Sequence, residues 1–174
     1  MKVSIHGLKL LEVREGIRLK AYKDSRGLPT IGVGHLIVPA DHLKVGDTIT
    51  QAQCDAFLAQ DIKQCEDAVN AVGVPLTQWQ FDALCSFCFN VGVGQKGFKG
   101  STVRKRLVAR DYNGVAQAMM LYKKPPEIIG RRQTEVNQFL HPDHWYSAAS
   151  TGNSADAISQ PATTPAGDPS APPK

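Results

Sequence analysis

Residues 11–35 are the most informative segment of the chain and read LEVREGIRLKAYKDSRGLPTIGVGH. Apolar residues that lead into this segment recur at helical spacing and predict a short helix over residues 4–15, ended by Gly16. Its apolar positions are Ile5, Leu8 and Leu11. The turn-forming run 23–27 then separates two short segments typical of strands. We therefore expect a helix followed by a β hairpin or small sheet within residues 19–38.

The rest of the chain is predicted to be mostly helical. Two capping boxes, Thr50 to Gln53 and Thr77 to Gln80, indicate helix starts, and Ser101 can cap a third helix. The expected helices cover residues 51–71, 77–90, 102–109, 111–122 and 129–140. One small β region among several helices indicates the α+β class.

Length and composition favour one soluble domain. The chain has 174 residues, of which 42% are hydrophobic and 21% are charged, as in ordinary globular proteins. The sequence contains no run of about 18 apolar residues, so no transmembrane helix is expected. The first residues also lack the apolar core of a secretory signal. Residues 147–174 are rich in Ala, Ser, Pro and Thr, which predicts a flexible tail behind a domain of residues 1–146.

The net charge of +4 is unevenly distributed. Residues 95–146 contain ten Lys and Arg but four Asp and Glu, and six of these basic side chains fall within residues 96–110. A basic region of this size favours an anionic partner, which could be cell-wall polymer, a membrane surface or nucleic acid. The charge by itself does not choose among these partners.

The four cysteines favour a structural interpretation. Cys54 and Cys65 are spaced to share one helix face, and Cys85 and Cys88 form a single CxxC inside an apolar run. Without a second such pair, a zinc site is not indicated. We expect small buried side chains, and disulfides remain open if the protein reaches an oxidising compartment.

Two carboxyls at the end of the first predicted helix are candidates for acid catalysis. Glu15 lies within about 60° of Leu8 and Leu11 around the helix, and Glu12 lies about 40° from Leu8. Burial at the edge of a core raises the pKa of a carboxyl and suits it to act as a general acid. Helix geometry alone does not choose between Glu12 and Glu15.

The hairpin offers a second carboxyl. Asp24 lies in the turn, where aspartate is common because its side chain accepts hydrogen bonds from nearby backbone amides. On the following strand, apolar residues alternate with Thr30, Gly32 and Gly34. We expect the apolar residues to face the core and the other face to stay open for a substrate. Carboxyls from a helix end and an adjoining turn could then flank one bond, which suits glycoside hydrolysis.

These residues resemble the signature of the phage-type lysozymes, the endolysins that cleave peptidoglycan. The first motifs are LEVREGIRL (11–19), AYKD (21–24) and PTIGVGH (29–35). The resemblance spans roughly residues 8–141 and continues in QFDAL (80–84), FCFNVG (87–92), Gly97-Phe98 with Ser101-Thr102, and Gly130-Arg131-Arg132. Several motifs in the family's order are more specific than one short pattern.

The resemblance implies that Glu15, Asp24 and Thr30 form the catalytic set, because the family has a Glu, Asp and Thr with gaps of nine and six residues. Glu15 would protonate the leaving oxygen of the β-1,4 bond between N-acetylmuramic acid and N-acetylglucosamine. Asp24 and Thr30 would orient a water on the opposite face of the sugar. Inversion is expected, with the two carboxyls about 6.5–9.5 Å apart. No metal and no cofactor are implied.

The resemblance also implies a lysozyme-like fold. A small N-terminal β lobe and a larger C-terminal helical lobe would be joined by the helix near residues 51–71, with a cleft between the lobes. Asn90 is expected to face that cleft and Arg131 to lie close to the catalytic glutamate. The open strand face adds Gly32 as a further contact with the substrate.

Other positions have simpler expected roles or depart from the family. Arg132 is expected to be a solvated charge, and His35 is expected to bond within the β lobe. Residues 39–48 form a somewhat extended connection. Residues 123–126, Lys-Lys-Pro-Pro, replace a Gly-rich or Trp-containing loop, which leaves the sugar contacts of this region open.

The implied partner is peptidoglycan, with no nucleic acid and no stable membrane insertion. The protein is expected to act as a monomer, to stay in the host cytoplasm, and to reach the cell wall through a lesion made by a phage holin. Three alternatives remain. Residues 96–110 could disrupt membranes as a cationic amphipathic helix, or they could bind nucleic acid, which would need no Glu15. A wall-binding domain without hydrolysis is the third.

Overall fold

The structure is a computed structural model that describes residues 1–24 and 26–141, all within the unit Met1–Pro142. The tail predicted at residues 147–174 lies outside the described residues, as does the predicted end of the domain at residue 146. Each element below is therefore an element of that one unit.

A three-stranded antiparallel sheet carries the predicted hairpin. Its strands are β1 (Arg18–Lys23), β2 (Pro29–Gly32) and β3 (His35–Leu36), in that order across the sheet. Tyr22 on β1 lies opposite Thr30 on β2. The prediction of a hairpin or small sheet is confirmed, and β3 extends the hairpin into a sheet.

The first helix, α1 (Ile5–Glu15), begins one residue after the predicted start at residue 4 and ends at the predicted residue 15. The Ser4 side chain accepts a hydrogen bond from the Gly7 N–H at its start, and Gly16 ends it with a φ of 76°, which glycine adopts easily. The buried residues of α1 are Gly7, Leu10 and Leu11. Ile5 is 77% exposed, so its assignment to the apolar face is wrong.

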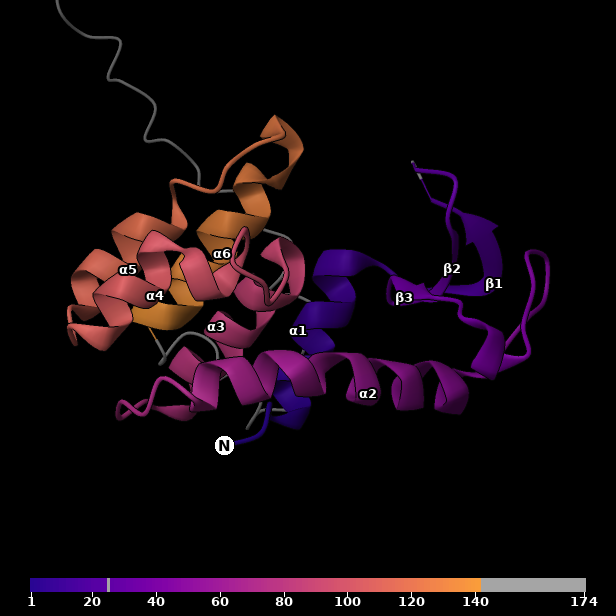
Figure 1. Cartoon of the computed structure of the whole chain (residues 1–174), viewed down its shortest axis with the longest axis horizontal. Helices are drawn as coiled ribbons and strands as arrows, with labels where there is room; N and C mark the ends of the chain where they lie inside the picture. The colour runs from indigo at the N-terminus through magenta and orange to yellow at the C-terminus, as the bar shows by residue number, and fades with distance from the viewer. Residues whose placement is uncertain (25, 142–174) are drawn as a thin grey trace, which may run out of the picture. The chain divides into compact units, whose positions relative to one another are not determined.

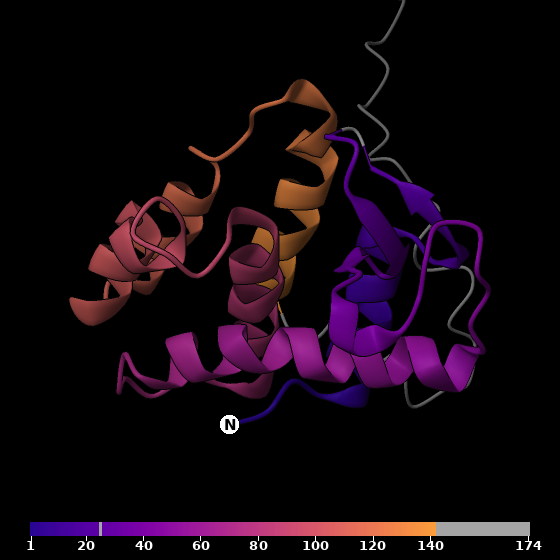
Figure 2. The ribbon, with the colours of Figure 1, turned by 45° about the vertical axis from the view of Figure 1, so that its right-hand side comes forward.

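Helix α2 (Gln51–Asn70) connects the two groups of elements in this unit. It contacts β2 and β3 as well as the next helix, α3. In Figures 1 and 2, the sheet lies near one end of α2 and helices α3 to α6 lie near the other. The capping box at Thr50 and Gln53 starts α2 as predicted.

The remaining helices also match the prediction. They are α3 (Gln78–Val91), α4 (Thr102–Val108), α5 (Tyr112–Met119) and α6 (Ile129–Leu140). Thr77 with Gln80, Ser101 and Asp111 cap the first three. Helix α3 is buried along most of its length and packs against α1, α2 and α6. Among the described residues, no helix is both long and apolar enough to cross a membrane.

All four cysteines are buried and free, as the structural interpretation predicts. A hydrogen bond with Cys88, together with burial, raises the pKa of the Cys65 thiol. Burial raises the pKa of Cys85 in the same way. Because the reactive form of cysteine is the thiolate, these side chains behave as small apolar groups of the core.

His35 joins the sheet to α2. Its ring is 5% exposed, and its nitrogens lie 3.1 Å from Asp41 and 2.9 Å from Asp61. The ring also stacks on Phe57 at 4.1 Å between centroids. The structural role is as predicted, but Phe57 and Asp61 belong to α2, so the contacts are not confined to the sheet region.

Candidate active site

Glu15 and Glu12 have opposite electrostatic surroundings. The Oε1 atom of Glu15 lies 2.6 Å from Nη1 of Arg131, and the Glu15 side chain is 22% exposed. Glu12, one turn earlier, lines a groove between α1 and α2. Burial and the nearby Asp55 carboxylate raise the pKa of Glu12. Glu15 therefore faces a cation, whereas Glu12 lies near the anion Asp55 as well as the cation Lys9, and Asp55 has the larger effect.

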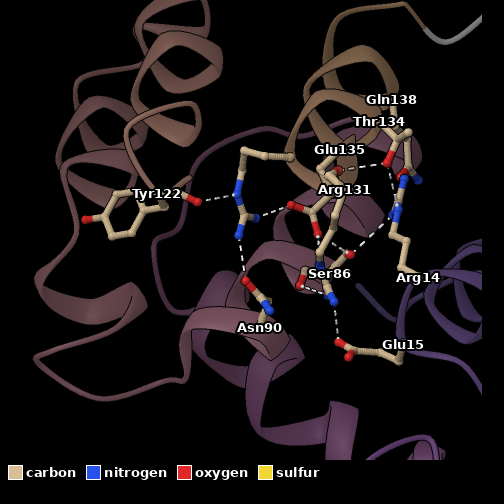
Figure 3. A network of polar contacts seen from close by, with 10 residues as sticks. Arg14, Glu15, Ser86, Asn90, Tyr122, Arg131, Thr134, Glu135 and Gln138 are labelled. Atoms are coloured by element: carbon tan, nitrogen blue, oxygen red, sulfur yellow. Dashed lines mark hydrogen bonds and ion pairs between the residues drawn. The ribbon is translucent and has the colours of Figure 1, made fainter. Parts of the chain in front are cut away.

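Arg131, near the start of α6, is the cation beside Glu15. Its side chain is 9% exposed and makes three contacts (Figure 3). Nη1 pairs with Glu15, Nε donates to Oε1 of Glu135 at 3.0 Å, and Nη2 donates to the Ser86 carbonyl at 3.2 Å. The expectation that Arg131 lies close to Glu15 is met, and its contact with substrate stays a prediction.

Arg132 differs from its expected role. It is not a solvated charge, because its side chain is fully buried. The guanidinium donates to Glu135, to the Tyr122 carbonyl at 3.1 Å and to Oδ1 of Asn90 at 2.6 Å, and it lies over the Phe87 ring. Burial lowers the pKa of Arg132. A charge buried this deeply needs partners on every side, and these residues supply them.

Sequence reasoning missed several residues of this network, among them Arg14, Ser86 and Glu135. Arg14 donates to the Ser86 hydroxyl at 3.2 Å, and burial lowers its pKa to about 10. Glu135 is fully buried and accepts from Ser86 and both neighbouring arginines. The spacing gives only part of the signal. Glu135 lies four residues after Arg131 and three after Arg132, which places the three side chains on one helix face, but it does not show that this face is buried.

Asp24 is held by its own turn. Its Oδ1 accepts hydrogen bonds from the backbone N–H groups of Arg26 and Leu28, both at 2.8 Å, and its Oδ2 pairs with the Arg26 guanidinium at 3.1 Å. The Leu28 N–H makes the largest contribution that lowers the pKa of Asp24, and the Arg26 backbone and side chain lower it further. The carboxylate is therefore ionised at neutral pH.

The strand face predicted to be open is closed. Thr30 is 5% exposed, and its hydroxyl donates to the Leu28 carbonyl at 3.1 Å. Gly32 is buried, and a Cβ added there would lie 3.1 Å from Sγ of Cys54 on α2. Of the three residues expected on this face, Gly34 alone is exposed. Packing against α2 therefore explains Gly32, and its contact with substrate stays a prediction.

Two further cavities lie in this unit, and neither is lined by Glu15, Asp24 or Thr30. One of about 420 Å³ is lined by Asn90, Tyr122 and Lys124, among others. The other, about 280 Å³, lies where β3, α2 and α3 approach one another and is lined by Leu36, Phe89 and others. Asn90 is exposed at the first cavity while its Oδ1 is bonded to Arg132. Both cavities have polar and apolar walls, as sugar-binding surfaces do.

The basic segment 96–110 contains the short turn Phe98–Gly100 and helix α4, which packs into the core on one side. Most of its Lys and Arg side chains are exposed, while Phe98, Val103 and Leu107 are fully buried and Val108 is 52% exposed. Most of the apolar face that a membrane-active helix would need is therefore already covered. Across residues 1–24 and 26–141, no group of three His, Cys, Asp or Glu side chains is arranged to hold a metal ion.

Several known proteins are similar to this chain in both sequence and fold. The family model for phage lysozyme matches residues 12–135. The endolysin of Salmonella phage P22 is 44% identical over 146 residues, which are 80% of this chain and 99% of that protein.

Solved structures agree with the sequence matches. An endolysin from Escherichia coli O157:H7 phage FAHEc1 superposes with a TM-score of 0.75 at 35% identity, over 82% of this chain and 95% of its own. The muramidase domain of SpmX from Asticaccaulis excentricus gives a TM-score of 0.72 at 35% identity, over 81% and 99% of the two chains.

Proposed function

This chain belongs to the phage lysozyme family and is a peptidoglycan-hydrolysing endolysin, and we propose that Glu15, Asp24 and Thr30 carry out its reaction. The bond cut is the β-1,4 link from N-acetylmuramic acid to N-acetylglucosamine. A raised pKa alone would favour Glu12. The ion pair between Arg131 and Glu15 is the observation that favours Glu15, because the family resemblance expects Arg131 beside the catalytic glutamate.

Glu15 is the proposed general acid. Arginine only donates hydrogen bonds, so the Oε1 atom that faces Arg131 acts as an acceptor. The catalytic proton then sits on the other oxygen, Oε2, and passes from there to the leaving sugar oxygen. Replacing Glu15 by Gln keeps the shape and an acceptor for Arg131 but removes the acid.

Asp24 is the proposed general base, and Thr30 is proposed to orient the attacking water with it. The low pKa of Asp24 keeps the carboxylate ionised, as is needed to take a proton from water. Thr30 lies opposite Tyr22 and bonds to the Leu28 carbonyl, so its hydroxyl is fixed beside the turn that holds Asp24. With a water held between Asp24 and the anomeric carbon, on the face of the sugar opposite Glu15, we expect inversion and a carboxyl separation of about 6.5–9.5 Å.

The finer parts of the proposal follow the family resemblance. Asn90, Arg131 and Gly32 contact the sugar chain in a cleft between the sheet side and the helical side. Residues 1–146 form the catalytic domain, with residues 147–174 as a tail. The protein acts as a monomer and reaches the wall from the host cytoplasm through a holin lesion.

Mass spectrometry of digested peptidoglycan tests the proposal. Wild type should release fragments with reducing muramic acid ends, and Glu15→Gln should release none while keeping the wild-type circular dichroism spectrum. Anhydro-muramic ends would indicate a lytic transglycosylase, and free stem peptides an amidase or peptidase. Normal fragment release by Glu15→Gln would refute the assignment of the acid.

The exposed basic segment favours contact with an anionic wall as a second property. Cell lysis by Glu15→Gln without any fragments would instead indicate a cationic, membrane-disrupting protein. Because Phe98, Val103 and Leu107 of this segment are buried, we expect no lysis by that variant.

A further inference from the structure

Glu135 on α6 is a fully buried carboxylate that the proposed reaction does not use directly. Burying a charge is costly unless its oxygens are paired and bonded. Both oxygens of Glu135 are engaged. Oε1 accepts from the Ser86 hydroxyl at 2.6 Å and from Nε of Arg131 at 3.0 Å, and Oε2 accepts from Arg132. A carboxylate kept in this position is a candidate for a role beyond packing.

The contact with Arg131 determines the direction of the Arg131 guanidinium. This group is flat and rigid, so fixing two of its nitrogens fixes the third. Nε is held by Glu135 and Nη2 by the Ser86 carbonyl, and Nη1 then points at Oε1 of Glu15 (Figure 3). The position of Nη1 against Glu15 therefore depends on Glu135.

We propose that Glu135 is a positioning residue that, through Arg131, fixes which oxygen of Glu15 carries the catalytic proton. The inference rests on the proposed role of Glu15 as general acid. With Nη1 of Arg131 held on Oε1, the proton occupies Oε2. When Arg131 is free to rotate, either oxygen can carry the proton, and one of the two arrangements points the acid away from the leaving sugar oxygen.

Charge supports the same role. Arg14, Arg131 and Arg132 lie near the Glu135 carboxylate, which is their shared counter-charge. The attraction of Glu135 opposes the effect of burial on both Arg14 and Arg132. With this carboxylate in place, Arg131 is shared between Glu135 and Glu15 rather than paired with Glu15 alone.

Glu135→Gln is the primary test, with steady-state hydrolysis of soluble peptidoglycan fragments as the readout. Glutamine keeps the shape and an acceptor but loses the charge that holds Nε. We expect kcat to fall about 10- to 100-fold, since small misplacements of a catalytic group cost that much, with KM within about twofold of wild type. An unchanged kcat, in a variant that is folded, would overturn the proposal.

Thr134→Val is the matched control. Thr134 neighbours Glu135 on α6, accepts from Nε of Arg14 at 3.3 Å and donates to the backbone carbonyl of Arg131 at 2.8 Å. This variant loses a hydrogen bond of the same network, and we expect kcat to stay within about twofold of wild type. An equal fall in kcat in both variants would mean that any damage to the network slows the reaction, which contradicts a specific role for Glu135.

A double-mutant cycle tests whether Glu135 acts through Arg131. If it does, Glu135→Gln should lower kcat little further in a chain that already carries Arg131→Leu, because the effects of coupled residues are not additive. Additive losses would contradict the proposal. If Glu135→Gln does not fold, Glu135→Asp replaces it in the cycle, since its carboxylate is one carbon too short to hold Arg131 and Arg132 at once.

The test separates this inference from the proposed function. If wild type fails to produce reducing muramic ends, the proposed function is refuted, and the inference about Glu135 is refuted with it because it depends on that function. If wild type cleaves and Glu15→Gln does not, the proposed function stands, and kcat of the Glu135 variants then decides the inference alone.

Discussion

Asp24 takes its hydrogen bonds from residues two and four positions along the chain, whereas Glu15 takes its ion pair from the last helix. The Asp24 turn is built from backbone N–H groups and needs no distant element. The Glu15 side is built from side chains of α1, α3 and α6 that meet in a buried network. One proposed catalytic carboxyl is therefore held locally and the other by tertiary structure.

This difference predicts how each side responds to mutation. Damage to the helical network should cost folding stability, because buried charges lose their partners. Damage to the turn should cost activity or change its pH dependence with little effect on stability, because the turn is exposed and local. Four substitutions test this contrast and are ordered by their expected effect on the free energy of unfolding.

Arg132→Leu should have the largest effect. It removes a buried guanidinium that bonds Glu135, Asn90 and the Tyr122 carbonyl. The buried Glu135 carboxylate then has too few cations around it to balance its negative charge. We expect a loss of about 3–5 kcal/mol, measured by urea unfolding followed by circular dichroism. Arg106→Leu is the control, since its pair with Asp111 is exposed and is worth about 0–1 kcal/mol. Similar losses in both would contradict the contrast.

The helical network also shows what sequence reasoning could not reach. Helix bounds and caps were predictable because they depend on neighbouring residues such as Thr50 with Gln53. The burial of Arg132 depends on Asn90 and Tyr122, which lie on other segments. An arginine followed by a glutamate at helical spacing is equally common on a solvated face, so the local pattern could not reveal a buried ion network.

Gly32→Ala should have the next largest effect. The backbone of Gly32 has a φ of 64°, and an added Cβ would lie 3.1 Å from Sγ of Cys54. We expect a loss of about 1–2 kcal/mol from backbone strain, with a further loss from the clash. Gly34→Ala separates the two effects, because Gly34 has a φ of 77° with nothing within 4 Å. Equal losses would mean that α2 does not constrain the sheet here.

The prediction that one face of β2 is open was wrong because that face is covered by a segment distant in the sequence. Alternation predicts one open face only when a strand is covered on one side. In β2, Thr30 and Ile31 are both buried and α2 contacts the strand, so both faces are covered. The residues of the hairpin were predictable from sequence, but the helix that covers its second face was not.

Asp24→Asn should hardly change stability and should abolish activity. The amide oxygen of asparagine can still accept the N–H groups of Arg26 and Leu28, and asparagine suits such turns. It cannot accept a proton from water, so we expect kcat to fall at least about 100-fold. The unfolding midpoint and fragment release measure the two effects. A large loss of stability would show that the turn depends on the charge of Asp24 itself.

Arg26→Ala should have the smallest effect on stability and a specific effect on pH dependence. The Leu28 and Arg26 N–H groups still lower the pKa of Asp24 in this variant, but the contribution of the Arg26 side chain is lost. The pKa of Asp24 therefore rises toward its ordinary value, and the acid limb of the kcat/KM profile should move to higher pH. Arg26→Lys keeps the charge without the paired geometry and should give a smaller shift.

Because a depressed carboxyl pKa stabilises the fold only where that carboxyl is ionised, any difference in folding stability between Arg26→Ala and wild type should be present near neutral pH and vanish in acid. An acid limb that does not move would mean that Asp24 is not the group whose ionisation the reaction requires.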